Sequence, residues 1–198
     1  MQKQFCCLLK PDGTPFAEGI IKFILREGEF NVVEARWIKI TPETASLIIP
    51  SDLLWFETVG GKVRDNCLRG GIDIRSHFSC DIDLIAMGKE VKKWNTDYLS
   101  EKESCFIIMN GDELEAKKFK DFAGRTDETD PATIRGAFRN INSKSIIECT
   151  LERVSYRNIV HVADPDRMAL ELGILSTIEY LSIWKEEKIA SLSFAWTP

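Results

Sequence analysis

The chain has 198 residues and a mass of 22.5 kDa, which suits one domain or one elaborated domain. Hydrophobic residues make up 44% of the sequence and charged residues 29%, a balance that excludes a disordered chain, a collagen-like chain and a disulfide scaffold. The formal charge of −5 argues against binding nucleic acid through global charge, so no nucleic-acid partner is expected, although a local basic pocket is compatible with it.

The sequence contains no segment that predicts membrane insertion or secretion. No apolar run approaches the ~18–20 residues of a membrane helix, and the apolar stretch at the N-terminus is too short for a signal peptide. Only His77 and His161 could supply imidazole to zinc, and the cysteines form no Cys-x-x-Cys pair. We expect a cytoplasmic protein without a membrane partner, with six buried, reduced thiols. The cysteines are Cys6, Cys7, Cys67, Cys80, Cys105 and Cys149.

In chain order, the first part of the sequence predicts strands and helices that alternate. Short apolar or alternating runs predict strands, and amphipathic runs bounded by N-cap residues or glycine predict helices. The expected elements are a strand over 3–9, a helix over 18–27, a strand over 30–40, a helix that begins at Thr41 and Pro42, a strand over 71–75, a helix over 84–94, a strand over 105–109 and a helix over 113–122. The pairs Gly60-Gly61 and Gly70-Gly71 are expected in turns, because they lack the motif of a phosphate loop.

The second part of the sequence begins with a polar loop and ends with helical patterns. The expected elements are a loop over 124–131, a helical turn over 133–138, a hairpin over 143–156, a strand over 158–161, a helix from Asp164 through Leu172 and a second helical stretch over 176–188. Asp164 and Pro165 predict the N-cap and first residue of the first of these helices. Strands that are well separated along the chain favour an α+β or α/β layer.

Three short segments carry residue types suited to phosphate chemistry. Lys10-Pro11-Asp12-Gly13 puts a lysine at the end of a strand, where the alternative is a plain surface turn. Residues 124–136 put cations and hydroxyls on a loop that leads into a helical turn, where free N–H groups favour anions; the alternative is a solvated loop. Residues 158–164 put His161 between a strand and a helix start, although a lone histidine is more often structural.

Together, these segments resemble the motifs of the nucleoside diphosphate kinases. That family carries a Lys-Pro-Asp-Gly turn after its first strand, a central Gly-x-Thr segment that ends in Thr-Ile-Arg-Gly, and Asn-x-x-His followed by Ser-Asp. All three segments occur here in the same order. The resemblance covers roughly residues 3–49 and 104–175. It implies a ferredoxin-like α+β fold, in which helices pack on an antiparallel, four-stranded sheet.

The resemblance also implies how the chain is organised and what it binds. It predicts one nucleoside diphosphate kinase-like domain over 1–198, with inserted or remodelled segments at about 50–103 and 140–156 and a C-terminal extension at about 176–198. It implies nucleoside tri- and diphosphates as substrates, Mg²⁺ bridging the nucleotide phosphates, and possible homo-oligomers.

The family's site residues can be matched position by position. His161 matches the nucleophile that accepts the γ-phosphate and passes it to a diphosphate. Lys10 matches the lysine on the transferred phosphate, Arg135 an arginine on the phosphates, and Thr126 a threonine near them. Asn158 matches an asparagine that contacts the sugar hydroxyl. The chemistry is reasonable, because an unperturbed histidine is mostly neutral at pH 7 and phosphoryl transfer needs nearby cations.

The chain departs from the family at several of these positions. Lys120 stands where the family has a second phosphate-binding arginine, and it keeps the charge but loses the bidentate fork. Ala163 replaces a serine that helps at the phosphate, and Ile49 replaces a tyrosine. Asp164 and Glu171 are expected as supporting residues, although Glu171 lies one residue out of register with the family's glutamate, about 100° around a helix. Candidates for the aromatic that stacks on the base are Trp55, Phe56 and Phe78.

These observations leave three hypotheses. The leading one is a phosphotransferase that moves phosphate between nucleotides by a ping-pong mechanism through phospho-His161. The second is a catalytically weak nucleotide-binding or regulatory module on the same fold, which the lost serine and the remodelled segment favour. The third is transfer from phospho-His161 to an acceptor that is not a nucleotide.

Overall fold

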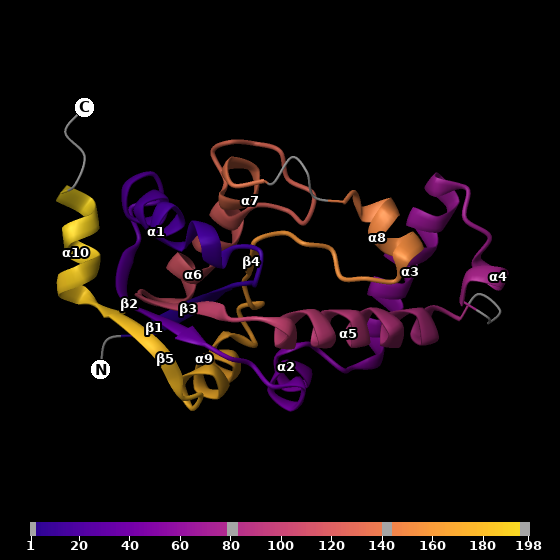
Figure 1. The fold of residues 1–198 in the computed structure, drawn as a ribbon, viewed down its shortest axis with the longest axis horizontal. Coiled ribbons are helices and arrows are strands. Elements are labelled where there is room, and N and C mark those ends of the chain that lie inside the picture. Colours follow the sequence, from indigo (N-terminus) through magenta and orange to yellow (C-terminus); the bar gives the residue numbers. More distant parts are fainter. Residues whose placement is uncertain (1–2, 79–82, 140–143, 195–198) are drawn as a thin grey trace. The chain divides into compact units, whose positions relative to one another are not determined.

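The computed structural model describes residues 3–78, 83–139 and 144–194, and these residues form two compact units. Unit 1 consists of Met1–Ile40, Lys102–Ile141 and Asn158–Pro198, and unit 2 of Thr41–Glu101 and Asn142–Arg157 (Figure 1). The sequence-based expectation of a single domain with inserted segments stays a prediction. The parts of it that fall on 140–143 and 195–198 lie outside the described residues.

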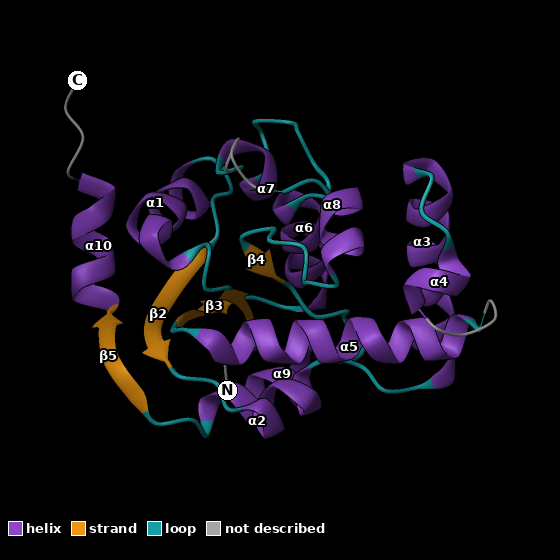
Figure 2. Cartoon of the chain, turned by 45° about the vertical axis from the view of Figure 1, so that its right-hand side comes forward, coloured by secondary structure: helices purple, strands orange, loops and turns teal. Residues whose placement is uncertain are grey.

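Unit 1 is built on an antiparallel sheet of five strands in the order β4-β1-β3-β2-β5. Figure 2 labels β2, β3, β4 and β5 of this sheet. The strands are β1 (Gln4–Leu9), β2 (Asn31–Ile38), β3 (Ser104–Asn110), β4 (Val160–His161) and β5 (Tyr180–Lys185). The α+β class and the antiparallel sheet are therefore confirmed, with one strand more than the four expected.

The additional strand, β5, overturns the helix expected over 176–188. It pairs along the edge of β2, where Trp184 packs on Trp37 with ring centroids 4.7 Å apart. Residues Tyr180–Lys185 contain two aromatic and one β-branched side chain, which suit a strand, and the neighbouring strand edge supplies the backbone partners. Only the last part of the expected helix forms, as the beginning of α10 (Glu186–Phe194).

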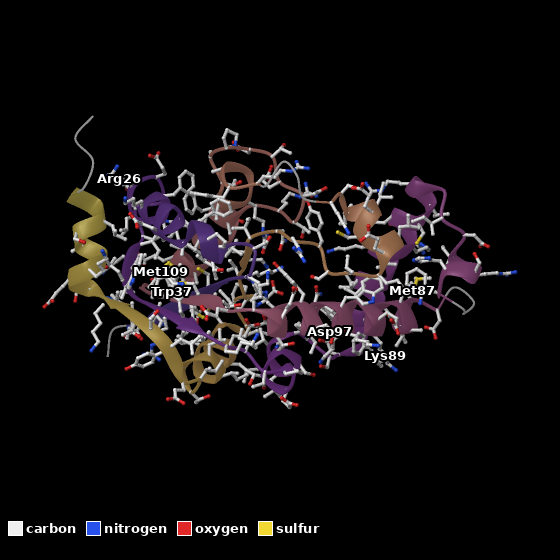
Figure 3. The ribbon with its side chains drawn as sticks, in the orientation of Figure 1. Arg26, Trp37, Met87, Lys89, Asp97 and Met109 are labelled. Atoms are coloured by element: carbon white, nitrogen blue, oxygen red, sulfur yellow. The ribbon has the colours of Figure 1, made fainter. Side chains whose placement is uncertain are left out.

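Helices cover both faces of this sheet (Figures 1 and 2). They are α1 (Ala17–Arg26), preceded by a 3₁₀ turn (Thr14–Phe16), α6 (Glu113–Ala123), α7 (Ile134–Ala137), α9 (Met168–Ser176) and α10. Successive residues of β1 show the two faces: Phe5 packs on Phe119 of α6, and the Cys6 thiol contacts Met168 of α9. Because both faces are covered, β1 is buried from Phe5 to Leu9, and Met109 in β3 is fully buried (Figure 3).

Unit 2 is helical in the described residues, with α2 (Pro42–Ile48), α3 (Leu53–Gly70), α4 (Ile74–Phe78), α5 (Leu84–Glu101) and α8 (Ile146–Glu152). The hairpin expected over 143–156 is wrong, because Ser145 and Glu148 form a capping box that begins α8. The strand expected over 71–75 is also wrong: Gly71 adopts a left-handed conformation with φ 65° that ends α3, and α4 follows. Met87 of α5 lies in the core of this unit (Figure 3).

Two glycines allow α3 and α5 to pack closely. A Cβ on Gly60 would lie 1.9 Å from the carbonyl oxygen of Leu84, and a Cβ on Gly88 would lie 2.3 Å from that of Phe56. Gly60 and Gly61 are therefore interior helix residues, and their expected placement in a turn is wrong. Close backbone contact between α3 and α5, rather than a turn of the chain, explains why position 60 is a glycine.

The described cysteines are all free and buried: Cys6, Cys7, Cys67, Cys105 and Cys149. Cys80 lies outside the described residues. Among the helices that the structure describes, none is both long and apolar enough to cross a membrane.

Candidate active site

The register of β4 on β1 aims the side chain of His161 at α9. His161 lies opposite Leu8 in the antiparallel pair, and residues opposite each other share a face of the sheet. Leu8 shares its face with Cys6, which contacts Met168 of α9. A two-residue strand is therefore enough to direct this histidine.

Glu171 of α9 meets His161 on this face. His161 Nε2 lies 2.7 Å from Glu171 Oε2, and the Glu171 side chain is only 3% exposed. An ionised carboxylate only accepts hydrogen bonds, so it pairs with the tautomer that carries its proton on Nε2 and leaves the Nδ1 lone pair available. The contact with Glu171 thus favours this tautomer and orients the ring.

The start of α9 explains how Glu171 reaches the histidine despite its different spacing. The helix expected to begin at Asp164 begins instead at Met168, so that expectation is wrong in its boundary. Residues 164–167 form a turn, in which the Arg167 amide donates to the Asp164 carbonyl at 2.9 Å. Because the turn resets the helical phase, counting residues from His161 does not predict which side chain of α9 faces it.

The Lys10-Pro11-Asp12-Gly13 turn holds the backbone just before His161. The Lys10 amide donates to the Ile159 carbonyl at 2.8 Å, and the Asp12 carboxylate accepts from the Ile159 amide at 3.0 Å. Ile159 has a φ of 69°, a strained conformation for a β-branched residue that these two bonds help to maintain. A Cβ on Gly13 would lie 2.5 Å from the Ile159 carbonyl oxygen, so only glycine allows this close approach.

Two cations border this part of the sheet. Arg135 of α7 donates to the Gly124 carbonyl and, from Nη2, to the Val160 carbonyl at 2.8 Å, immediately before His161. Lys10 donates from Nζ to Asn158 Oδ1. Burial, followed by the neighbouring Arg135, lowers the pKa of Lys10 from 10.5 to about 8, with Asp12 opposing the shift.

The same site lowers the pKa of Arg135 to about 10, because the guanidinium is desolvated. Its Nε is buried and has no hydrogen-bond partner in the part of the chain that the structure describes. Lys10 and Arg135 are desolvated cations that donate to neutral oxygens, and one carboxylate, that of Asp12, lies nearby. A bound anion would reduce the repulsion between the two positive charges. The arrangement therefore favours a ligand with several negative oxygens.

The other sequence-predicted residues are placed less closely together. Lys120 of α6 forms an exposed ion pair with Asp164, rather than contacting Lys10 or Arg135. Thr126 is exposed in the loop after α6, and in the described residues no hydrogen bond joins it to the rest of the site. Ala163 is buried at 3% exposure and offers no hydroxyl. Ile49 is the C-cap of α2 in unit 2.

One charged residue at the site was not predicted from the sequence. Arg167 Nε lies 3.6 Å from Glu171 Oε1, on the carboxylate oxygen that His161 does not use. The sequence shows that Arg167 and Glu171 are four residues apart on a predicted helix. This spacing indicates a role at the site only once the structure shows that Glu171 faces His161.

A metal of the protein's own does not fit this constellation. In the described ranges, no group of three or more His, Cys, Asp or Glu side chains could hold a metal ion. The side chains that gather near β4 are mainly cations, which suit phosphate oxygens.

Solved structures share this architecture. The chain aligns with the structure of a nucleoside diphosphate kinase from Pyrobaculum aerophilum with a TM-score of 0.78 and 21% identity, covering 96% of this chain and 99% of that one. The chain has the nucleoside diphosphate kinase fold. Because the alignment covers 96% of the chain, the shared fold extends well beyond the segments 3–49 and 104–175 that carry the sequence resemblance.

Two further structures with this fold were solved with ligands. A nucleoside diphosphate kinase from Borrelia burgdorferi, a transition-state mimic with bound vanadate and ADP, aligns with a TM-score of 0.58 and 16% identity over 94% of this chain and 89% of that one. A halophilic enzyme from Halobacterium salinarum in complex with CDP aligns with a TM-score of 0.51 and 13% identity over 97% and 99%. No family model and no curated protein matches the sequence.

Proposed function

We propose that this protein transfers a phosphoryl group from a nucleoside triphosphate to a nucleoside diphosphate through a phosphohistidine at His161. The observation that carries the proposal is the pairing of His161 Nε2 with the buried Glu171 carboxylate at 2.7 Å, on a strand bordered by Lys10 and Arg135. A purely structural histidine needs neither a buried carboxylate on one nitrogen nor two desolvated cations beside its strand. The shared fold supports the same conclusion.

The proposed reaction uses the ring nitrogen that Glu171 leaves available. Nδ1 of His161 attacks the γ-phosphorus, the bond from that phosphorus to the bridging oxygen breaks, and the nucleoside diphosphate leaves with the bond's electron pair. The Nε2 proton stays on the ring, where Glu171 stabilises the positive charge that develops. A terminal oxygen of a second diphosphate then attacks this phosphorus, and the Nδ1–P bond breaks with its electron pair returning to Nδ1, which restores the ring to its starting state.

The cations have the roles of charge neutralisation and positioning. Lys10 and Arg135 would bind the oxygens of the transferred phosphate, and the Arg135 Nε–H would gain a partner there. Asn158 keeps the Lys10 ammonium in place and would contact the sugar hydroxyl. Lys120 would exchange its ion pair with Asp164 for a contact with the phosphates, and Thr126 would contact them from its loop.

Magnesium would enter with the nucleotide in this proposal. The described residues offer no metal cluster, so the phosphate oxygens would supply its ligands. When bound, the ion neutralises part of the phosphate charge. The acceptor and the base preference are to be found experimentally.

Transfer between nucleotides tests the proposal directly. With labelled ATP, Mg²⁺ and a panel of unlabelled diphosphates, we expect labelled triphosphates and parallel double-reciprocal lines, the pattern of a ping-pong reaction. His161→Gln should abolish transfer, whereas His77→Gln should not, because the Nε2 of His77 contacts the Thr150 carbonyl at 3.0 Å rather than a carboxylate. Undiminished transfer by His161→Gln would contradict the proposal.

A further inference from the structure

Glu171 is a buried carboxylate with a different partner on each of its oxygens. Oε2 accepts from His161 Nε2 at 2.7 Å, and Oε1 lies 3.6 Å from Nε of Arg167. With a 3% exposed side chain, the carboxylate has little access to water, so its partners are protein groups. Arg167 thus contacts the same carboxylate that pairs with the histidine.

The position of Arg167 is unfavourable for its helix. It is the N-cap residue of α9, where a side chain that accepts hydrogen bonds is preferred, and its side chain makes no capping bond. A positive charge is also disfavoured at this end of a helix by the aligned peptide dipoles. A capping role does not account for an arginine here, whereas the contact with Glu171 brings its guanidinium to the site.

We propose that Arg167 is a positioning residue for His161: its guanidinium holds the Glu171 carboxylate in the rotation and charge state that orient the imidazole for phosphoryl transfer. This inference rests on the proposed function. Ala163, buried two residues after His161, has no hydroxyl that could hydrogen-bond the Glu171 carboxylate. Arg167 contacts this carboxylate on the oxygen that His161 does not use.

The groups around the pair set the expected pH behaviour. Glu171 and His161 are faced by Cys6 from β1, whose thiol pKa is raised first by burial and then by Glu171, and by Arg167 at the start of α9. Arg135 of α7 contacts the backbone next to His161, and the charge of Arg135 in turn acts on Lys10. With these other groups unchanged, removing the positive charge of Arg167 favours proton uptake by the His161–Glu171 pair as a whole.

Histidine NMR tests the inference without relying on activity. The chain has two histidines, so ¹⁵N-histidine spectra of wild type and of His77→Gln identify the His161 signals. We expect Arg167→Gln to shift the midpoint of the His161 titration to higher pH and Arg167→Lys to leave it near wild type. The matched control is Arg36→Gln, since Arg36 is similarly buried on β2 and pairs with Glu34. An unchanged midpoint in Arg167→Gln would overturn the inference.

Kinetics of phosphoenzyme formation give the second readout. Arg167→Gln should lower the rate constant about tenfold or more, because a slightly misplaced nucleophile loses much of its reactivity. The ATP concentration for half-maximal rate should stay unchanged, the acidic limb of the pH profile should move upward with the NMR midpoint, and Arg167→Lys should recover most of the rate. Equal losses in Arg167→Gln and Arg167→Lys would contradict a positioning role. If wild type formed no phosphoenzyme, the proposed function would fail, while the NMR experiment would still decide whether Arg167 controls the pair.

Discussion

At the scale of single residues, the site combines groups that are costly to bury together. Lys10 and Arg135 both have lowered pKa values, mainly through desolvation, and each is bonded to neutral oxygens rather than to a carboxylate. The sequence predicted both residues through motif resemblance, whereas their mutual influence depends on burial that only the structure shows. Such a pair is poised for an anion because ligand binding removes the repulsion.

The lowered pKa of Lys10 predicts a pH limit for nucleotide binding. Lys10 must be protonated to attract phosphate, so affinity should be constant below pH 8 and fall as the pH rises through about 8, by up to tenfold per unit. Isothermal titration calorimetry with ADP across pH 7–9.5 measures this decline. Lys10→Gln should bind ADP weakly at every pH, without the decline near pH 8. Lys118→Gln, on the exposed side of α6, should bind ADP as wild type does. Affinity that stays constant to pH 9.5 in wild type would contradict the prediction.

At the scale of secondary-structure elements, the most reliable sequence signals were caps and long apolar runs. Thr41 caps α2 and Asp112 begins α6 with a capping box, close to the predicted boundaries. The errors came where tertiary contact decides the structure, as in β5, which forms on an available strand edge, and in Gly60, whose role depends on a partner helix distant in sequence.

The adjacent glycines of α3 give an element-scale prediction with an internal control. Gly60→Ala would place its Cβ against the Leu84 carbonyl and should lower the free energy of unfolding by about 2 kcal/mol or more. A Cβ on Gly61 would meet no atom within 4 Å, so Gly61→Ala should raise the free energy of unfolding by about 0.5–1 kcal/mol through helix propensity. Urea denaturation of the two variants tests the packing of α3 on α5. A Gly60→Ala variant as stable as wild type would contradict it.

At the scale of the whole molecule, the resemblance predicted the fold class, the antiparallel sheet and the grouping of Lys10, Asn158 and His161 at neighbouring strands and turns. It could not predict the helices of unit 2, because the motifs lie outside them, nor the strand that the C-terminal segment adds. Possible homo-oligomers stay a prediction. The added β5 bears on them, since it covers the edge of β2 and becomes an edge strand itself.

Removing this cover should destabilise unit 1. A chain that ends at Thr177 lacks β5 and α10, which bury Ile189 and Leu192 and pack Trp184 on Trp37. We expect a melting temperature lower by about 5 °C or more, because the loss of a few kcal/mol lowers it by roughly 2–4 °C per kcal/mol in a chain of this size. We also expect concentration-dependent association through the exposed β2 edge, measured by light scattering. A chain that ends at Phe194 is the matched control. If the shorter chain had the same association state and melting temperature as the chain that ends at Phe194, β5 would have no such role.

Whether His161 accepts a phosphoryl group can be measured by intact-mass spectrometry of the phosphoenzyme. After incubation with ATP and Mg²⁺, we expect the mass of one added phosphoryl group, labile to acid, in wild type and His77→Gln but not in His161→Gln. Addition of a suitable nucleoside diphosphate should remove it. A wild-type protein that binds nucleotide without gaining this mass, or a His161→Gln variant that gains it, would show that His161 is not the acceptor.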